Sequence, residues 1–330
     1  MAIIDKPSDY FNTKLYTGNG STNNITGVGF QPNFSWIKNR NLSGGYAHCA
    51  FDSIRGANKR IKPNNTIAEE TLSNSFNSFD TDGFTLGTDS QTDEMNKSGA
   101  LQVSWNWKEQ TGVFDIVSFT GNGSARTISH NLGSVPTFYV VKSRSNTTSW
   151  ACYHQSQGPT KIAGLFNDQS APEANANFFN NTAPTSSVFS VGSDATLNGN
   201  GRTFICYLFS DSSMSKMGSY IGNNSTNGTF VYLGFKPALI IVKCTSASNE
   251  NWMMLDNKRD GYNVENEQLF TNETIPEESN DEADFLSNGF KLRRNNSRMN
   301  GSGATYMYLA FAENPLVTST GNGSIPATAR

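Results

Sequence analysis

Two charged turns are the first candidates for chemistry, because only 16% of the residues are charged. Asp52 is followed three residues later by Arg55, and Asp256 is followed at the same spacing by Arg259. A carboxylate beside a guanidinium can bind a polar ligand such as a sugar, or it can form an ion pair that holds a loop. We favour the ion pair, because such pairs are common in turns and contribute only about 0–1 kcal/mol when exposed. The corresponding place in the middle of the chain holds His154, so a shared ligand site would be absent there.

Acidic runs are a second candidate, for calcium. Ca²⁺ takes oxygen ligands from acidic turns, but the EF-hand spacing is absent and an acidic run is usually a solvated loop. We therefore expect no metal site and no cofactor, and calcium stays open as the alternative. The carboxylates concerned are Glu273, Glu277, Glu278, Asp281, Glu282 and Asp284, and a looser group of Asp80, Asp82, Asp89 and Asp93.

Catalytic motifs are not found in the sequence. The three histidines, His48, His130 and His154, lie in different sequence contexts. There is no Gly-x-Ser-x-Gly elbow, no His-Glu-x-x-His helix and no phosphate-binding glycine loop. A glycosidase needs only two carboxylates, but nothing in the sequence selects a pair. We expect no enzyme activity and no catalytic residues, and a polysaccharide-cleaving enzyme is the least favoured alternative.

Composition argues against several classes of partner. The formal net charge is −3, without the basic patch that nucleic acids or anionic membranes attract. No apolar run reaches the length of about 18 residues that a membrane span needs, and the first residues do not read as a secretory signal. We therefore expect that the protein neither binds nucleic acid nor inserts into a membrane. We also expect that it is synthesised in the cytoplasm.

The elements that must position these residues occur three times. The motif Thr-Gly-Asn-Gly-Ser at residues 17–21 recurs at 120–124 and, as Ile-Gly-Asn-Asn-Ser, at 221–225, with a period of about 102 residues. Each copy then runs into an apolar stretch that ends at Lys38, Lys142 or Lys243. Catalytic centres seldom survive in triplicate, so the repetition favours a modular, structural protein.

The most regular strand closes each copy, at residues 101–107, 203–209 and 305–311. The first alternates apolar and polar residues, so we expect one of its faces to meet water, whereas the other two are apolar on both faces and should be more deeply buried. Trp105 and Trp107 share a face of the first strand, which is either the sandwich interior or a platform on which sugars stack. We favour the interior, because large rings dominate core burial.

The cysteines have no metal-ligand spacing, so we expect buried structural thiols. Cys49 and Cys152 occupy nearly the same point in successive repeats, which a small buried hydrophobe explains better than a disulfide. The remaining two are Cys206 and Cys244.

Short strands at a spacing of about 8 to 12 residues, separated by turns rich in Gly and Asn, predict the fold class. We expect an all-β protein of three tandem antiparallel β-sandwich modules, jelly-roll-like, that together form an elongated body. Residues 65–74 are the one segment for which a short helix is expected. The predicted division is an N-terminal docking segment at 1–14, repeats at 15–110, 115–211 and 217–315, and a C-terminal tail at 316–330.

The chain resembles the repeat-built virion structural proteins of marine and cyanobacterial tailed phages. The resemblance rests on the Thr-Gly-Asn-Gly-Ser motif, Gly-Phe-x-Pro, Lys-x-Arg at 38–40, Asp-x-x-Arg-Gly and the closing Ala-Phe-Ala-Glu-Asn-Pro at 310–315, and it covers nearly all of the chain. It implies a non-enzymatic part of the virion, which is a tail fibre or fibre-like appendage, or a protein decorating the capsid.

The expected function follows from the resemblance and the repeats together. The leading hypothesis is a virion structural protein of the tail that contacts other virion proteins and the host surface, with a surface glycan as a partner. The alternative is a capsid decoration protein that clamps neighbouring subunits. Open sheet edges favour a closed homo-oligomer, which would be a trimer in a fibre.

Overall fold

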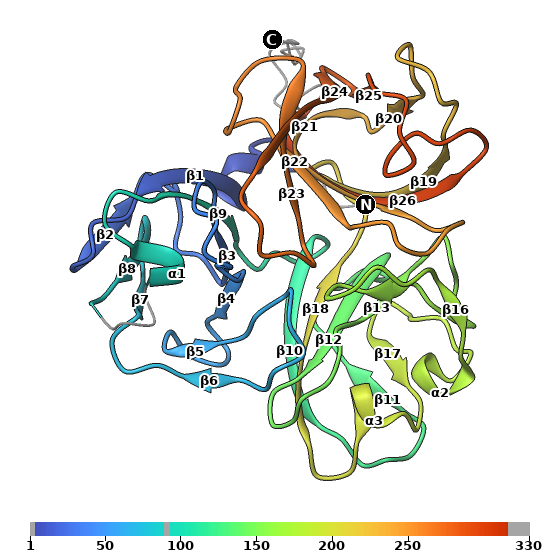
Figure 1. The fold of residues 1–330 in the computed structure, drawn as a ribbon. Helices are drawn as coiled ribbons and strands as arrows, with labels where there is room; N and C mark the ends of the chain where they lie inside the picture. The colour runs from blue at the N-terminus through green and yellow to red at the C-terminus, as the bar shows by residue number, and fades with distance from the viewer. Residues whose placement is uncertain (1–3, 89–92, 316–330) are drawn as a thin grey trace.

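The structure, a computed structural model, describes residues 4–88 and 93–315, and it confirms the predicted all-β fold. Three modules follow one another along the chain, at residues 11–107, 114–209 and 215–315, and we call them modules 1, 2 and 3. Modules 1 and 2 each have a principal sheet and a smaller second sheet that covers it, whereas module 3 is built on one eight-stranded sheet (Figure 1). The helices are single turns, namely η1 (Pro7–Asp9), α1 (Asp93–Asn96), α2 (Ala176–Phe179) and α3 (Ala195–Asn198).

The principal sheets share one strand order. Module 1 has the order β1-β9-β3-β4, module 2 has β10-β18-β12-β13-β15, and module 3 begins with β19-β26-β21-β22-β23. In every case the strand that closes the repeat lies between its opening strand and the lysine-ended strand, so it is a central strand. The bounds are β1 (Phe11–Thr17), β3 (Phe34–Asn39), β4 (Cys49–Asp52), β9 (Leu101–Trp107), β10 (Phe114–Thr120), β12 (Phe138–Ser143), β13 (Ala151–His154), β15 (Gly164–Leu165), β18 (Thr203–Phe209), β19 (Ser215–Ile221), β21 (Phe235–Cys244), β22 (Met253–Asp256), β23 (Glu265–Phe270) and β26 (Thr305–Pro315).

The second sheets differ more between the modules. Their strand orders are β2-β8-β7 in module 1 and β11-β17 in module 2, whereas in module 3 the principal sheet continues through β24 and β25 to β20 and curls over itself. The bounds are β2 (Asn23–Thr26), β7 (Phe76–Asp80), β8 (Gly83–Leu86), β11 (Arg126–Ser129), β17 (Val188–Val191), β20 (Phe230–Tyr232), β24 (Glu278–Leu286) and β25 (Gly289–Leu292), with two short pairs formed by β5 (Lys59–Arg60) and β6 (Glu70–Thr71), and by β14 (Lys161–Ile162) and β16 (Glu173–Ala174).

The Gly-Asn loop after each opening strand is pinned by one buried asparagine. In module 2, the side-chain oxygen of Asn198 accepts from the N–H of Asn122 at 3.1 Å, and its amide donates to Ser124 O at 2.7 Å and Gly192 O at 2.6 Å. Asn96 and Asn300 make the equivalent bonds in the other modules. The repeated loop motif therefore serves the backbone geometry of each module.

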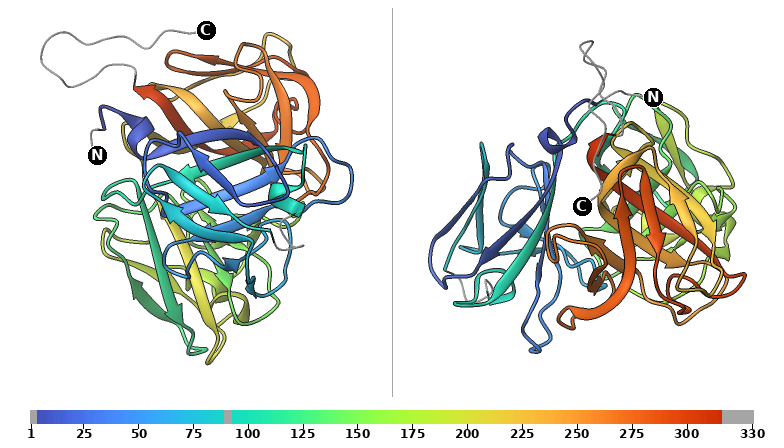
Figure 2. Two further views of the ribbon diagram at one scale, coloured as in Figure 1. Left: turned by 90° about the vertical axis from the view of Figure 1, so that its left-hand side faces the viewer. Right: turned by 90° about the horizontal axis from the view of Figure 1, so that it is seen from above.

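The three modules surround a common hydrophobic core. This core contains Trp105, Trp107, Tyr207, Phe209 and Phe311 of the three closing strands, together with apolar residues of the strands on either side, and it is continuous with the interior of module 3. Modules 1 and 2 also have their own smaller cores. Figures 1 and 2 show the modules arranged around one centre. The elongated, end-to-end body expected from the repeats is not what forms, because each principal sheet turns an aromatic face outward from its own sandwich and buries it against the other two modules.

The first closing strand corrects the prediction that it faces water on one side. Gln102, Ser104 and Asn106 are fully buried inside module 1. Asn106 accepts from the Ser35 hydroxyl at 2.8 Å and donates to Ser104 Oγ at 3.0 Å, so the polar face satisfies part of its own hydrogen bonding. The aromatic face of the same strand points to the common core. In a simple sandwich the apolar face would line the interior of the module, whereas here the polar face does.

Two further expectations differ from the structure. Residues 65–74 form no helix; they contain the short strand β6, since Asn, Thr and Ser favour turns over helix interiors. The expected docking segment at 1–14 is partly built into the fold. Phe11 begins β1 and stacks on Phe311 with ring centroids 5.3 Å apart, and the Ile4 N–H and C=O both bond to Ser213.

Candidate functional site

The two predicted Asp-Arg pairs lie at the junctions between modules. Asp52 is the last residue of β4 and accepts from Arg55 Nε, with both side chains fully buried. The hydroxyl of Tyr207, from module 2, donates to the same carboxylate oxygen at 2.6 Å. Burial alone would lower the pKa of Arg55, but the Asp52 carboxylate, together with Tyr207 and Glu69, more than offsets this, and the net pKa is raised. The guanidinium therefore stays charged, and Asp52 carries one partner from its own module and one from the neighbour.

The second pair repeats this arrangement at a different junction. Asp256, the last residue of β22, accepts from Arg259 Nε at 2.7 Å, and both side chains are again fully buried. The indole N–H of Trp105, from module 1, donates to the same Asp256 oxygen at 3.1 Å. Neither pair opens to a ligand from solvent; both connect two modules.

Module 2 has His154 at the end of β13, where the other modules have aspartate. The neighbouring donors explain the exchange. Trp105, Tyr207 and Leu309 are each the fifth residue of a closing strand, and Leu309 has no polar hydrogen to offer. A carboxylate at position 154 would lack the donor that its two counterparts have.

The hydrogen bonds of His154 fit that site. Its Nδ1 accepts from the Ser156 N–H at 3.1 Å, so Nε2 carries the proton and donates to the Tyr308 carbonyl of module 3 at 3.2 Å. Burial lowers the pKa of His154 to about 4, which keeps the ring neutral. The second repeat thus has histidine in place of the aspartate because module 3 offers it a backbone carbonyl and no side-chain donor.

The lysines that end the apolar strands form a second set of junction contacts, which the sequence did not assign. Lys38 donates to Thr274 O of module 3 at 3.2 Å, Lys142 to Thr66 O of module 1 at 3.1 Å, and Lys243 to Gln169 O of module 2 at 3.1 Å. All three are buried, and burial lowers the pKa of each to about 8. The signal available in the sequence was a lysine at the end of an apolar strand in every copy.

A third set of contacts joins each module to the same segment of its neighbour that the lysine reaches. The indole N–H of Trp150 donates to Lys62 O at 3.1 Å, and that of Trp252 donates to Leu165 O at 3.0 Å. In module 1 the equivalent residue is His48, whose Nε2 bonds to Phe270 O at 2.9 Å. Each module therefore donates hydrogen bonds to one segment of the next module, and these contacts form a closed cycle.

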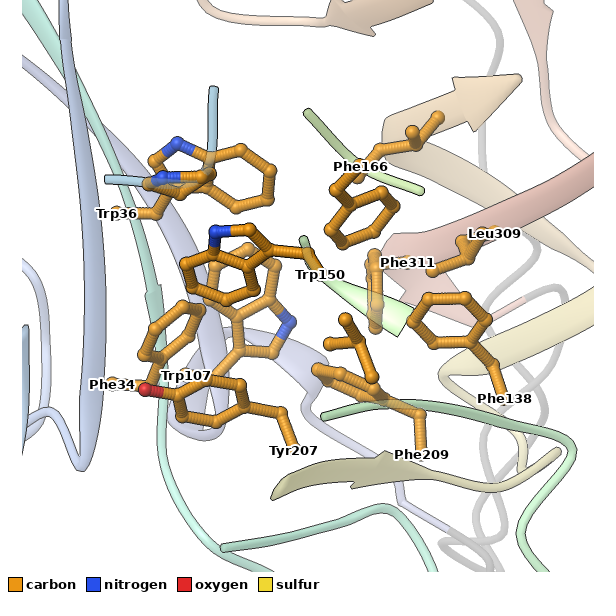
Figure 3. A pocket seen from close by; sticks show the side chains of 13 residues that line it. Phe34, Trp36, Trp107, Phe138, Trp150, Phe166, Tyr207, Phe209, Leu309 and Phe311 are labelled. Atoms are coloured by element: carbon orange, nitrogen blue, oxygen red, sulfur yellow. The ribbon is translucent and has the colours of Figure 1, made fainter. Parts of the chain in front are cut away.

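Where the three modules meet, a cavity of about 20 Å³ remains (Figure 3). Its lining is aromatic and aliphatic and comes from all three modules. Among its side-chain polar atoms that the structure describes, Trp107 Nε1 alone lacks a partner, and a buried water needs about two to four. Trp105 and Trp107 are thus neither a sugar platform nor the interior of their own sandwich; they fill the common core. The residues lining the cavity are Phe34, Trp36, Pro63, Trp107, Phe138, Val140, Trp150, Phe166, Tyr207, Phe209, Ile241, Leu309 and Phe311.

The four cysteines are buried and free, as the sequence predicted. Cys49 and Cys152 lie at nearly the same point of successive repeats, as predicted, but they are offset by one residue. Cys49 pairs with Ile37 and lies in the core of module 1, whereas Cys152 pairs with Val140 and lies in the common core. Because successive residues of a strand point to opposite faces, the two thiols occupy different environments.

The acidic runs are used within the fold. Glu277 pairs with Arg40, Glu282 with Arg294, and Asp284 with Arg293. Asp82 accepts from two backbone N–H groups, which lower its pKa. Asp89 and the Asp93 side chain lie outside the described part of the chain. Within the described part, no group of three or more His, Cys, Asp or Glu side chains could hold a metal ion.

Comparison with known proteins identifies a family whose function is unknown. A family model described as a domain of unknown function, DUF7483, matches residues 6–315. No curated protein matches the sequence. Among the described residues, no helix is long and apolar enough to cross a membrane.

Proposed function

This chain belongs to the DUF7483 family, and we propose that it is a non-enzymatic structural protein of a bacteriophage virion, tail fibre-like or tail-associated. The observation that carries the proposal is how the repeated polar residues are used. Asp52, Asp256 and the lysines of the three apolar strands all bond across module junctions. A repeat whose polar residues hold the modules together is more typical of a rigid structural protein than of an enzyme.

The closed cycle of modules also supports a place on a symmetric particle. Three related modules around one centre give a single chain an approximate threefold shape, which fits a threefold axis of a fibre or of a capsid. The proposed partners are other virion proteins and, at the host, a surface glycan. Association into a homo-oligomer would then use the outer surface, because the aromatic faces are already buried inside one chain.

Two measurements test the proposal. Antibody-labelled particles imaged by electron microscopy should carry the label at the tail. Label spread over the capsid at hundreds of copies per particle would favour the decoration protein instead, and particles without label would overturn the proposal. A reducing-sugar assay on purified chain with bacterial polysaccharides should give no product; release of sugar would favour the polysaccharide-cleaving enzyme.

A further inference from the structure

The feature of module 3 that has no counterpart among the repeated motifs is an open pocket of about 260 Å³. It is lined by residues of β21, of the turn after β22 that carries Arg259, and of β23, β24 and β26. The turn is longer than its counterpart in module 1, and its residues Tyr262 and Asn263 line the pocket. The lining residues are Lys236, Asn257, Lys258, Gly261, Tyr262, Asn263, Glu265, Phe285 and Glu313.

Two buried polar groups in this lining lack partners. Glu265 is 3% exposed, and its Oε2 has no hydrogen-bond partner among the described residues. Asn257 is likewise buried, and its Oδ1 has none. A buried polar group without a partner is destabilising, and a ligand hydroxyl bound here would supply the missing hydrogen bonds. Neither group takes part in the junction contacts.

The remaining lining residues define the chemistry of the ligand. Tyr262 is 74% exposed and supplies an aromatic ring at the pocket. Lys236 pairs with Glu313 at 2.8 Å, and Lys258 lies 3.6 Å from the same carboxylate. The two lysines disfavour a cationic ligand, and the acidic groups disfavour an anionic one.

The protonation of Glu265 fits a neutral ligand. Burial, aided by the nearby carboxylates of Asp256 and Asp260, raises the pKa of Glu265 to about 8. The carboxyl therefore keeps its proton at neutral pH and can both donate and accept a hydrogen bond. A hydroxyl group has the same double capacity.

We propose that the pocket of module 3 binds a neutral sugar unit, with hydroxyls on Glu265 and Asn257 and the ring against Tyr262. Aromatic rings beside a few convergent polar groups are typical of specific small-molecule pockets. The volume lies just below the roughly 300 Å³ at which pockets for drug-sized ligands begin, which suits one sugar unit and not a long chain. The inference rests on the proposed function to the extent that a host glycan supplies the sugar.

The test is binding of neutral sugars to the purified full chain. The probes are glucose, galactose, mannose, N-acetylglucosamine and their disaccharides, measured by saturation-transfer NMR and titration calorimetry. At least one should bind, and Tyr262→Ala should weaken its affinity at least tenfold. Glu265→Leu should do the same, whereas Glu265→Gln, which keeps a donor and an acceptor, should lose less than threefold.

The matched control is Tyr232→Ala. Tyr232 is 54% exposed on module 3 but outside the pocket, so its removal should leave affinity unchanged. Thermal unfolding of each variant checks that the fold persists. No binding by any probe, equal loss in Tyr232→Ala and Tyr262→Ala, or tighter binding of glucosamine or galacturonate than of the neutral sugars would overturn the proposal. Sugar binding without label on particles would retain the pocket and reject the virion role, and the reverse result would reject the pocket alone.

Discussion

At the scale of single residues, the junctions depend on buried groups that each satisfy two modules. Asp52 is held by Arg55 of its own turn and by the Tyr207 hydroxyl of module 2. Removing one partner of a buried ion pair leaves the other charge uncompensated and is strongly destabilising, whereas replacing the whole pair by apolar residues is often neutral. The tyrosine is therefore a sensitive point at which to weaken one junction without changing its shape.

Tyr207→Phe should destabilise the protein by about 1.5–3 kcal/mol, the usual range for a hydrogen bond to a charged group. Urea unfolding at neutral pH measures the loss. The matched control is Tyr139→Phe, since the Tyr139 hydroxyl is buried without a partner in the described structure, and its removal should not destabilise the protein and can stabilise it by up to about 1–3 kcal/mol. Equal effects of the two substitutions would show that the bond to Asp52 contributes nothing specific.

At the scale of elements, the Gly-Asn loop and the asparagine that pins it form one unit in each module. The loop leaves the opening strand, and the asparagine precedes the closing strand that pairs with it along seven residues. Gly121 must be glycine here, because a Cβ would lie 2.3 Å from Gly199 O. The unit therefore fixes how the two strands enter the sheet.

Asn198→Ala should cost about 2–4 kcal/mol, because it leaves the Asn122 N–H and the carbonyls of Ser124 and Gly192 without this partner. The unfolding midpoint in urea is the measurement. Asn295→Ala, at an exposed asparagine, is the control and should change stability by less than about 0.5 kcal/mol. A cost below 1 kcal/mol for Asn198→Ala would contradict the pinning role.

At the scale of the whole molecule, the common core makes one cooperative unit of three modules. Phe311 of module 3 contacts rings from both other modules, with its centroid 5.4 Å from that of Trp107 and 5.4 Å from that of Phe209. A module removed from its neighbours would expose this aromatic face. Stability is therefore shared across the chain, unlike in a linear array where repeats contact only their neighbours.

Phe311→Ala should cost about 3–5 kcal/mol, the range for a buried phenylalanine. Hydrogen exchange followed by mass spectrometry should show amide protection falling equally in all three modules, because they unfold together. Phe230→Ala, at an exposed ring of module 3, should leave all three unchanged. Loss of protection confined to module 3 in Phe311→Ala would mean that the modules unfold independently.

The sequence by itself determined the repeats, the all-β class and the buried thiols. These depend on local patterns, since turn residues and alternating side chains act within a few residues of each other. Even the Asp-Arg pairs were visible, because Asp52 and Arg55 lie in one turn.

Only the tertiary structure decided which face of each strand is covered and by what. Alternation in 101–107 separates two faces but cannot say that the polar one lies inside module 1 and the aromatic one between modules. The partner of Asp52 is 155 positions away in the sequence, and the pocket around Glu265 joins strands from both ends of module 3. Such contacts depend on how sheets pack, and packing brings together residues whose separation along the chain carries no periodic signal.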